Sequence, residues 1–270
     1  MTYLEDLFSV NGKTALVTGG ATGIGRMISE ALVHGGASVI IASRKVVDCE
    51  AVADQLNALD ASGSARALLG DVSTEDGVLA LANAVKSQTE TLDILINNAG
   101  TTWGKDYERF PYHAWSRVLD VNITGLFNLT RELTPVLKAA ARDEDPARII
   151  NLGSVMGTQP VAEGAYSYSA SKAAVHHLTR ILANELANHR ITVNAFAPGP
   201  FPSNMTAFAT NTPEKSARVA NRVPMGRVGA STDIAGATLF LCSKAGAYVT
   251  GTVLPIDGGQ SVQHGVALFT

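Results

Sequence analysis

The stretch Thr14-Ala15-Leu16-Val17-Thr18-Gly19-Gly20-Ala21-Thr22-Gly23-Ile24-Gly25 decides the fold of this chain. Its first five residues are mostly apolar, as in a strand covered on both faces, and a helix is predicted to follow over Ile24–Val33. Glycines between a buried strand and a helix allow a tight turn and let backbone N–H groups approach a pyrophosphate, whose charge the helix N-terminus favours. The stretch therefore predicts a dinucleotide-binding loop, with contacts from Gly19, Thr22, Gly23, Ile24 and Gly25.

The rest of the chain repeats this alternation of strand and helix. Six more short apolar runs predict strands, at Ser38–Ala42, Ala65–Leu69, Leu92–Asn97, Arg148–Leu152, Ile191–Ala197 and Thr252–Ile256. Helices are predicted between them, for example over Thr74–Thr89, Ala165–Ala187 and Thr232–Leu241. The alternation predicts an α/β fold with a doubly wound, mostly parallel sheet and helices on both faces. Since no repeat, low-complexity segment or linker divides the sequence, we expect a single domain over residues 1–270.

The composition excludes several classes of function. Apolar residues make up 46% and charged residues 17% of the chain, which is typical of a globular protein with ample material to bury. The net charge of −3 gives no reason to expect nucleic acid or an anionic membrane as a partner. The first residues carry Glu5 and Asp6 without a basic-then-apolar pattern, and no apolar run reaches membrane-spanning length. We therefore expect a cytoplasmic protein, with Cys49 and Cys242 as reduced thiols on helices.

Two segments interrupt the alternation. Residues 198–227, rich in Pro, Asn, Ser and Thr, follow the sixth predicted strand. Because ligands of open parallel sheets bind beyond the carboxyl ends of the strands, this segment is predicted to be a substrate loop or lid. An ordinary surface insertion is the alternative. The tail, residues 261–270, is expected to be poorly ordered or to form a subunit contact.

The end of the second predicted strand, Ser43-Arg44-Lys45, indicates which dinucleotide the loop binds. NAD-specific sites usually carry an acidic residue here for the ribose hydroxyls, and this strand end has none. Arg44 can pair with a 2′-phosphate and Ser43 can donate a hydrogen bond to it, so NADP(H) is favoured over NAD(H). Thr22 argues against this choice, since many NADP enzymes carry a second basic residue there. Arg44 as an ordinary surface cation stays an alternative.

The turns after the third and fourth predicted strands complete the cofactor site. The Asp71 carboxylate could accept a hydrogen bond from the adenine amino group, and Val72 could pack on the adenine ring. The small-residue turn Asn98-Ala99-Gly100 would let backbone come close to the adenosine ribose. A plain strand-ending turn is the alternative for this second segment.

The segment Tyr168-Ser169-Ala170-Ser171-Lys172 places a phenol and an ammonium on one face of a predicted helix. An unperturbed tyrosine, with a pKa of ~10, is a poor acid–base catalyst at neutral pH. A Lys172 cation, together with an oxidised nicotinamide, would lower that pKa. Ser154 ends the fifth predicted strand and can hydrogen-bond a substrate oxygen as it becomes an alkoxide. Asn122 could hold a water that links Lys172 to solvent, or could simply cap or kink a helix.

Other side chains are expected near this pair. Tyr166 is not four residues before a lysine, so it is predicted to line the substrate pocket rather than to act as the acid. Trp103, Phe201 and Met205 also suggest a partly apolar pocket, though each could be core packing. The adjacent His176 and His177 would point to different faces of a helix, and no carboxylate or cysteine completes a site. We therefore expect no metal.

Together these motifs resemble the short-chain dehydrogenase/reductase family, in family order from Lys13 to Gly259. The resemblance implies a Rossmann-type sheet of seven parallel strands and a catalytic tetrad of Asn122, Ser154, Tyr168 and Lys172. It implies cofactor contacts by Tyr168, Lys172, Pro198 and Gly199, and a homotetramer built on the long catalytic helix and the strand near residues 255–259. The gap from Ser154 to Tyr168 is a residue longer than in many members, and we expect residues 158–164 to absorb it.

Residues 98–104, 201–206 and 224–227 resemble the β-ketoacyl reductases associated with rhamnolipid synthesis. This resemblance implies NADPH-dependent reduction of a small-molecule carbonyl, such as a 3-oxoacyl thioester, to a secondary alcohol, with Tyr168 as proton donor. An NAD(P)-dependent alcohol, sugar or polyol dehydrogenase is the alternative enzyme, because related members act on these substrates with almost the same core. A non-catalytic NADP(H)-binding sensor or scaffold is the alternative from another class, and the intact tetrad argues against it.

Overall fold

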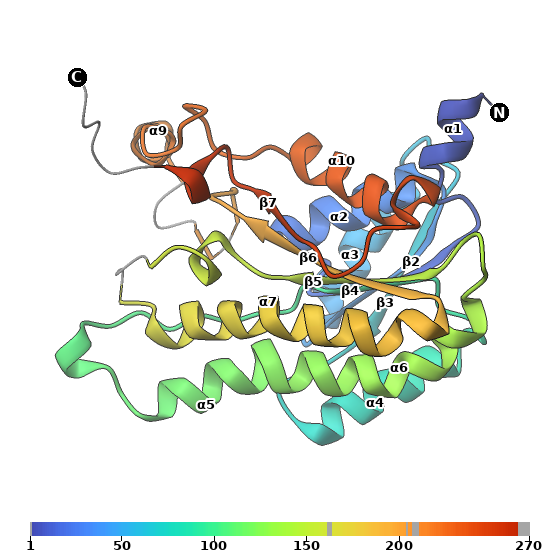
Figure 1. Ribbon diagram of the computed structural model, residues 1–270, viewed down its shortest axis with the longest axis horizontal. Helices are drawn as coiled ribbons and strands as arrows, with labels where there is room; N and C mark the ends of the chain where they lie inside the picture. The colour runs from blue at the N-terminus through green and yellow to red at the C-terminus, as the bar shows by residue number, and fades with distance from the viewer. Residues whose placement is uncertain (1, 161–163, 204, 207–210, 264–270) are drawn as a thin grey trace.

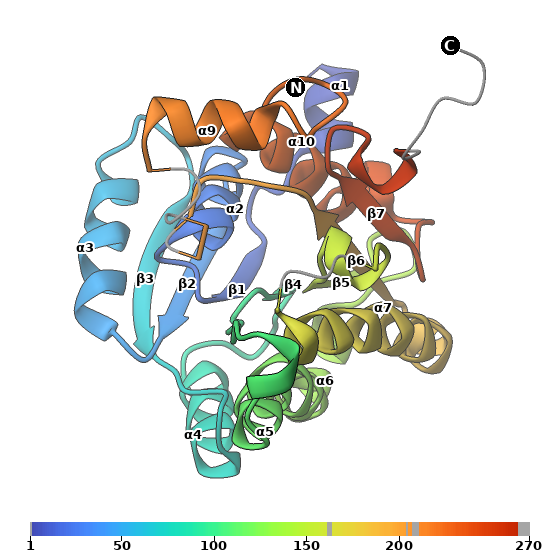
Figure 2. The same ribbon diagram turned by 90° about the vertical axis from the view of Figure 1, so that its left-hand side faces the viewer.

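The computed structural model describes residues 2–160, 164–203, 205–206 and 211–263, and is built around one sheet. Its strands are β1 (Thr14–Thr18), β2 (Ser38–Ser43), β3 (Ser64–Leu69), β4 (Ile94–Asn97), β5 (Ala147–Leu152), β6 (Ile191–Pro198) and β7 (Val253–Ile256). All neighbours pair in parallel, in the order β3-β2-β1-β4-β5-β6-β7, which Figure 2 shows. The predicted seven-stranded parallel sheet is therefore confirmed.

Helices cover both faces of the sheet (Figure 1). One face carries α2 (Gly23–His34), α3 (Val46–Asn57) and α10 (Ser231–Cys242), and the other carries α4 (Glu75–Lys86), α6 (Leu126–Ala140) and α7 (Tyr166–Leu186). Side chains of β1 alternate between the two layers: Ala15 and Val17 join the core beside α2, whereas Leu16 joins the core beside α4. The doubly wound Rossmann-type fold is confirmed.

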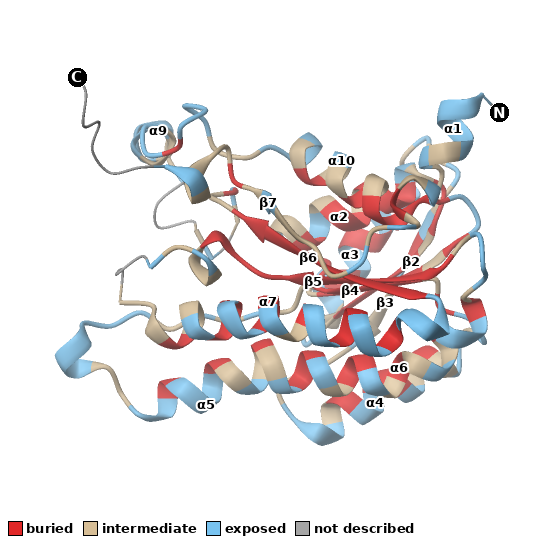
Figure 3. Cartoon of the chain, viewed as in Figure 1, coloured by how far each residue is buried: buried red, intermediate tan, exposed pale blue. Residues whose placement is uncertain are grey.

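The central strands are buried along their whole length (Figure 3). Every residue of β4, β5 and β6 is buried, which explains why their sequences are nearly continuous apolar runs instead of alternating ones. Cys49 and Cys242 are free cysteines on helices α3 and α10, as predicted, and both are buried. None of the described helices is both long and apolar enough to cross a membrane.

Some helical elements in the described part of the chain were not predicted from the sequence. The helix α1 (Tyr3–Phe8) buries no residue, so it leaves no apolar periodicity to detect; a capping box between Thr2 and Glu5 starts it. A π-helical turn over Asp120–Gly125 joins α5 (His113–Leu119) to α6 and carries Asn122. Such turns often occur at functional sites.

The interrupting segments are described in part. Residues 198–227 contain α9 (Pro213–Ala220), whose first turn is capped by the Thr212 hydroxyl. Residues 161–163 lie outside the described part of the chain, so the expectation that the loop at 158–164 absorbs an extra residue stays untested. The same holds for residues 264–270 of the tail.

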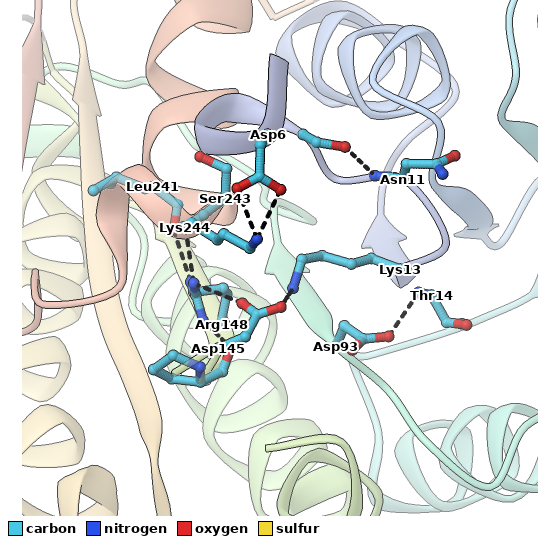
Figure 4. Close-up of polar contacts among 12 residues, drawn as sticks. Asp6, Asn11, Lys13, Thr14, Asp93, Asp145, Arg148, Leu241, Ser243 and Lys244 are labelled. Atoms are coloured by element: carbon cyan, nitrogen blue, oxygen red, sulfur yellow. Dashed lines mark hydrogen bonds and ion pairs between the residues drawn. The ribbon is translucent and has the colours of Figure 1, made fainter. Parts of the chain in front are cut away.

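A buried cation lies at the amino end of β5 (Figure 4). Arg148 at the start of β5 has no exposed surface. Its guanidinium donates to Leu241 O at 3.2 Å and to Ser243 O at 2.8 Å, at the carboxyl end of α10, and to the Asp145 carboxylate at 3.1 Å. Lys13 pairs with the same carboxylate. The cluster thus ties β5 to α10 by neutralising the helix end and satisfying its carbonyls.

We expect Arg148→Met to lower the free energy of unfolding by about 3–5 kcal/mol, because it leaves these buried carbonyls and part of the Asp145 charge unpaired. The matched control is Lys244→Met, which removes the exposed ion pair with Asp6 in the same cluster and should cost at most about 1 kcal/mol. Urea denaturation of the three proteins measures both changes. Equal effects would show that the buried network does not stabilise the fold.

Candidate active site

The segments that follow the strands gather at the carboxyl edge of the sheet, on the left in Figure 1 and facing the viewer in Figure 2. The glycine loop lies here, between β1 and α2. Gly19 and Gly23 have φ angles of +64° and +51°, which favour glycine. Thr22 makes no side-chain cap on α2, and the first turn of α2 holds no acidic residue. Open N–H groups at such a helix start suit an anion, so the residues of this loop fit a pyrophosphate.

Thr18, which the sequence analysis did not single out, locks the glycine loop to the turn after β4. Its hydroxyl accepts hydrogen bonds from the backbone N–H groups of Asn98 and Ala99, both at 3.0 Å. The Asn98 amide nitrogen donates in return to Thr18 O at 2.9 Å and Gly19 O at 3.0 Å. The sequence signal that could have identified Thr18 is a hydroxyl side chain at the last position of an otherwise apolar strand.

The predicted adenosine contacts lie at the ends of β2 and β3. Arg44 is exposed and close enough to Asp71 to influence its carboxyl. Burial raises the pKa of Asp71, but hydrogen bonds from Ser73 and the Arg44 charge outweigh this, and the pKa is lowered overall. Ser43 already donates its hydroxyl hydrogen to Lys45 O at 3.1 Å. Val72 is buried in the core beside α4. Arg44 is thus the freer of the two predicted phosphate ligands.

The segment after β6 lies over the glycine loop. A β-carbon placed on Gly23 would come within 2.8 Å of Ser203 Cβ, which brings Ser203 against the start of α2. Sequence reasoning missed this residue, because nothing in the local pattern of residues 198–227 reveals which segment it covers. Pro198 ends β6, and Gly199 N donates to Ile256 O at 3.0 Å, so both predicted residues lie at the same edge.

The phenol and the ammonium predicted to carry the chemistry meet beside the end of β5. Lys172 is buried, and its Nζ lies 5.5 Å from the centre of the Tyr168 ring. Nζ donates to Leu152 O at 2.6 Å. Burial lowers the pKa of Lys172 to about 8. The structure therefore brings these two side chains together with the strand that ends next to Ser154.

Ser154 contacts the phenol directly. Burial raises the pKa of Tyr168, and a hydrogen bond with the Ser154 side chain opposes this rise only in part. In the polypeptide alone the pKa of Tyr168 is therefore raised, and its lowering by Lys172 together with an oxidised nicotinamide stays a prediction. The Ser154 oxygen also accepts a hydrogen bond from Met156 N at 3.2 Å.

Asn122 connects the turn after β4 to α7. Its Oδ1 accepts from Thr101 N at 2.9 Å, and its Nδ2 donates to Thr101 O at 3.0 Å and to Ser171 Oγ at 2.9 Å. A β-carbon on Gly100 would lie 3.4 Å from Asn122 Oδ1 and 3.6 Å from Lys172 Nζ. The turn after β4 thus lies next to Asn122 and Lys172, and Lys172 in turn lies beside Tyr168, which contacts Ser154.

The predicted substrate-pocket residues separate into two groups. Tyr166 packs edge to face against Phe110 and Tyr107, with ring centres 5.3 Å and 5.8 Å apart. Trp103 lies beneath the Arg117 guanidinium at 5.0 Å, and Met205 is 40% exposed. Phe201, in contrast, is only 2% exposed and belongs to the hydrophobic core. The Phe201 ring therefore packs in the core, which was the alternative to its lining the substrate pocket.

The two adjacent histidines lie on different faces of α7. His176 is buried and accepts from Ser154 N at 3.4 Å, whereas His177 is exposed. Within the described ranges, no three His, Cys, Asp or Glu side chains lie together in a way that could hold a metal ion.

A fold and a site of this kind define the short-chain dehydrogenases/reductases. The sequence model of the family described as enoyl-(acyl carrier protein) reductase matches residues 19–261, and the chain belongs to this family of oxidoreductases. The predicted family and enzyme class are confirmed.

Individual relatives cover almost the whole chain. The rhamnolipids biosynthesis 3-oxoacyl-[acyl-carrier-protein] reductase of Pseudomonas aeruginosa is 46% identical over 256 residues, or 95% of this chain and 99% of that protein. The galactitol 2-dehydrogenase (L-tagatose-forming) of Cereibacter sphaeroides is 36% identical over 95% of this chain and 98% of its own. The solved NADP active-site complex of Pseudomonas aeruginosa RhlG has a TM-score of 0.91 at 43% identity, covering 95% of this chain and 99% of that one.

Proposed function

We propose that this protein catalyses the NADPH-dependent reduction of a ketone to a secondary alcohol, with a 3-oxoacyl thioester as its substrate class. The observation that carries the proposal is the contact of the half-buried Tyr168 phenol with Ser154, beside the Lys172 ammonium. The similarity to a 3-oxoacyl-[acyl-carrier-protein] reductase supports the substrate class, and the similarity to an NADP complex supports the cofactor.

The residues of this chain supply position, a proton and a hydrogen bond. When bound, NADPH supplies the hydride. Tyr168 is protonated at neutral pH and donates its proton to the carbonyl oxygen, and the neighbouring Lys172 ammonium stabilises the phenolate that remains. Ser154 donates a hydrogen bond to the same oxygen as negative charge develops there. Lys172 would hold the nicotinamide ribose and return a proton to Tyr168, with Asn122 on the path from solvent.

The test of this proposal is the loss of reduced-nicotinamide absorbance with purified protein. NADPH and NADH are supplied in parallel, with an acetoacetyl thioester and a panel of simple ketones as substrates. We expect consumption of NADPH with the thioester and much slower consumption of NADH. Consumption of NADH alone would contradict the cofactor assignment, and reduction of simple ketones alone would contradict the thioester.

An NAD(P)-dependent sugar or polyol dehydrogenase is the second candidate, supported by the similarity to a galactitol 2-dehydrogenase. It would reduce NADP⁺ or NAD⁺ with a polyol and leave the thioester untouched. A non-catalytic sensor is disfavoured by Lys172: burying an ammonium beside a phenol is unfavourable, and cofactor binding alone does not require that pair.

We expect Arg44→Ala to raise the KM for NADPH by about 10–100-fold, since it removes charge-assisted hydrogen bonds to the 2′-phosphate. The KM for NADH, which lacks that phosphate, should stay unchanged. Lys45→Ala removes the neighbouring exposed cation and serves as the matched control. If the KM values for both cofactors rise equally in the Arg44 variant, the Arg44 side chain does not bind the 2′-phosphate.

We further propose a cytoplasmic homotetramer. Apolar side chains on the outer faces of α6 and α7 support this assembly: Phe127 is 38% exposed and Ile181 is 51% exposed, beside a groove lined by Pro135 and Leu182. Sedimentation equilibrium should give four times the chain mass. A Phe127→Asp variant that stays tetrameric would show that this face is not an interface.

A further inference from the structure

His176 is a buried titratable side chain that the proposed mechanism does not use. It is 5% exposed, and its ring lies against the turn that carries Ser154. A β-carbon on Gly153 would overlap its Nε2, and one on Gly157 would lie 2.7 Å from its Cε1. Glycines on both sides of Ser154 therefore form a slot that the imidazole fills.

The helix α7 holds the end of β5 at two points, one helical turn apart. Lys172 Nζ donates to Leu152 O at 2.6 Å, and His176 Nε2 accepts from Ser154 N at 3.4 Å. Between them, Gly153 N donates to Phe196 O of β6 at 2.8 Å. The backbones of Leu152, Gly153 and Ser154 are thus each held by a hydrogen bond, from or to a side chain of α7 at Leu152 and Ser154 and to β6 at Gly153.

We propose that His176 is a positioning residue, which sets the place of the Ser154 hydroxyl relative to the Tyr168 phenol by accepting the Ser154 amide hydrogen. The inference rests on the reductase function proposed above. A ring that accepts at Nε2 must be neutral and carry its hydrogen on Nδ1. Burial first, and then the charges of Arg180 and Lys172, lower the pKa of His176 to about 4, so the ring is neutral at physiological pH.

Kinetics of matched variants separate positioning from packing. His176→Leu keeps an apolar bulk but removes the acceptor; we expect kcat with NADPH and an acetoacetyl thioester to fall about 10-fold, with the KM for NADPH unchanged. His176→Gln offers an acceptor oxygen and should recover most of that loss. His177→Leu, on the exposed face, should behave as wild type. Wild-type kcat in His176→Leu, or equal losses in the Leu and Gln variants, would overturn the proposal.

A measurement without substrate tests the contact itself. Long-range ¹⁵N–¹H spectra of the histidine-labelled full chain, assigned with the His176→Gln variant, should show His176 neutral and protonated on Nδ1 at neutral pH. Protonation on Nε2 or a charged ring would overturn the positioning role. A wild-type protein that reduces no carbonyl would instead overturn the proposed function, so the two failures are distinguishable.

Discussion

Replacing Tyr168 by Phe should lower kcat by about 10²–10⁴-fold and leave cofactor affinity unchanged. The variant removes one hydroxyl, which supplies the proton and contacts Ser154, whereas the ring beside Lys172 stays in place. Steady-state turnover with NADPH and an acetoacetyl thioester measures the loss. Quenching of protein fluorescence by NADPH measures the affinity.

Tyr166→Phe is the matched control for this variant. Tyr166 begins the same helix, and its ring packs against Phe110 and Tyr107 instead of Ser154. Loss of its hydroxyl should leave kcat unchanged within a few-fold. If turnover survives in Tyr168→Phe and disappears in Tyr166→Phe, Tyr166 is the acid and the proposed role of Tyr168 is wrong.

Replacing Gly25 by Ala should weaken NADPH binding on the order of 100-fold, equivalent to about 2.7 kcal/mol. A β-carbon at this position would overlap Gly19 O and the Asn98 amide nitrogen. Both atoms belong to the hydrogen bonds that join the end of β1 to the turn after β4. Because these hydrogen bonds hold the two atoms in place, the glycine loop must shift to make room for the added methyl group. The shift moves the backbone N–H groups at the start of α2 away from the phosphates.

The control for this backbone effect is Gly236→Ala in α10, where a β-carbon would meet nothing within 4 Å. An alanine there should stabilise the helix by about 0.5–1 kcal/mol and leave NADPH binding unchanged. Fluorescence titration with NADPH and thermal unfolding compare the two variants. Normal affinity in Gly25→Ala would mean that the glycine loop does not hold the phosphates.

Most of the fold was predictable because its signals are local. The apolar runs of β4, β5 and β6 follow from burial on both faces, and the predicted ends of all seven strands differ from the observed ones by at most two residues. The helix α1 escaped prediction because it buries nothing and depends on its cap. The gathering of Asn122, Ser154, Tyr168 and Lys172 was expected only from the family resemblance, since their positions span 50 residues of chain.

By itself, the sequence determined the alternation of strands and helices, the turn at the glycine loop and the spacing of Tyr168 and Lys172 on one helix face. These features depend on residues adjacent in the chain, where side-chain periodicity and backbone freedom act directly. Only the tertiary structure decided that Phe201 enters the core, that His176 contacts Ser154 and that burial raises the pKa of Tyr168 in the polypeptide alone. Those outcomes depend on desolvation and on contacts between distant segments, which exist only once the chain has folded.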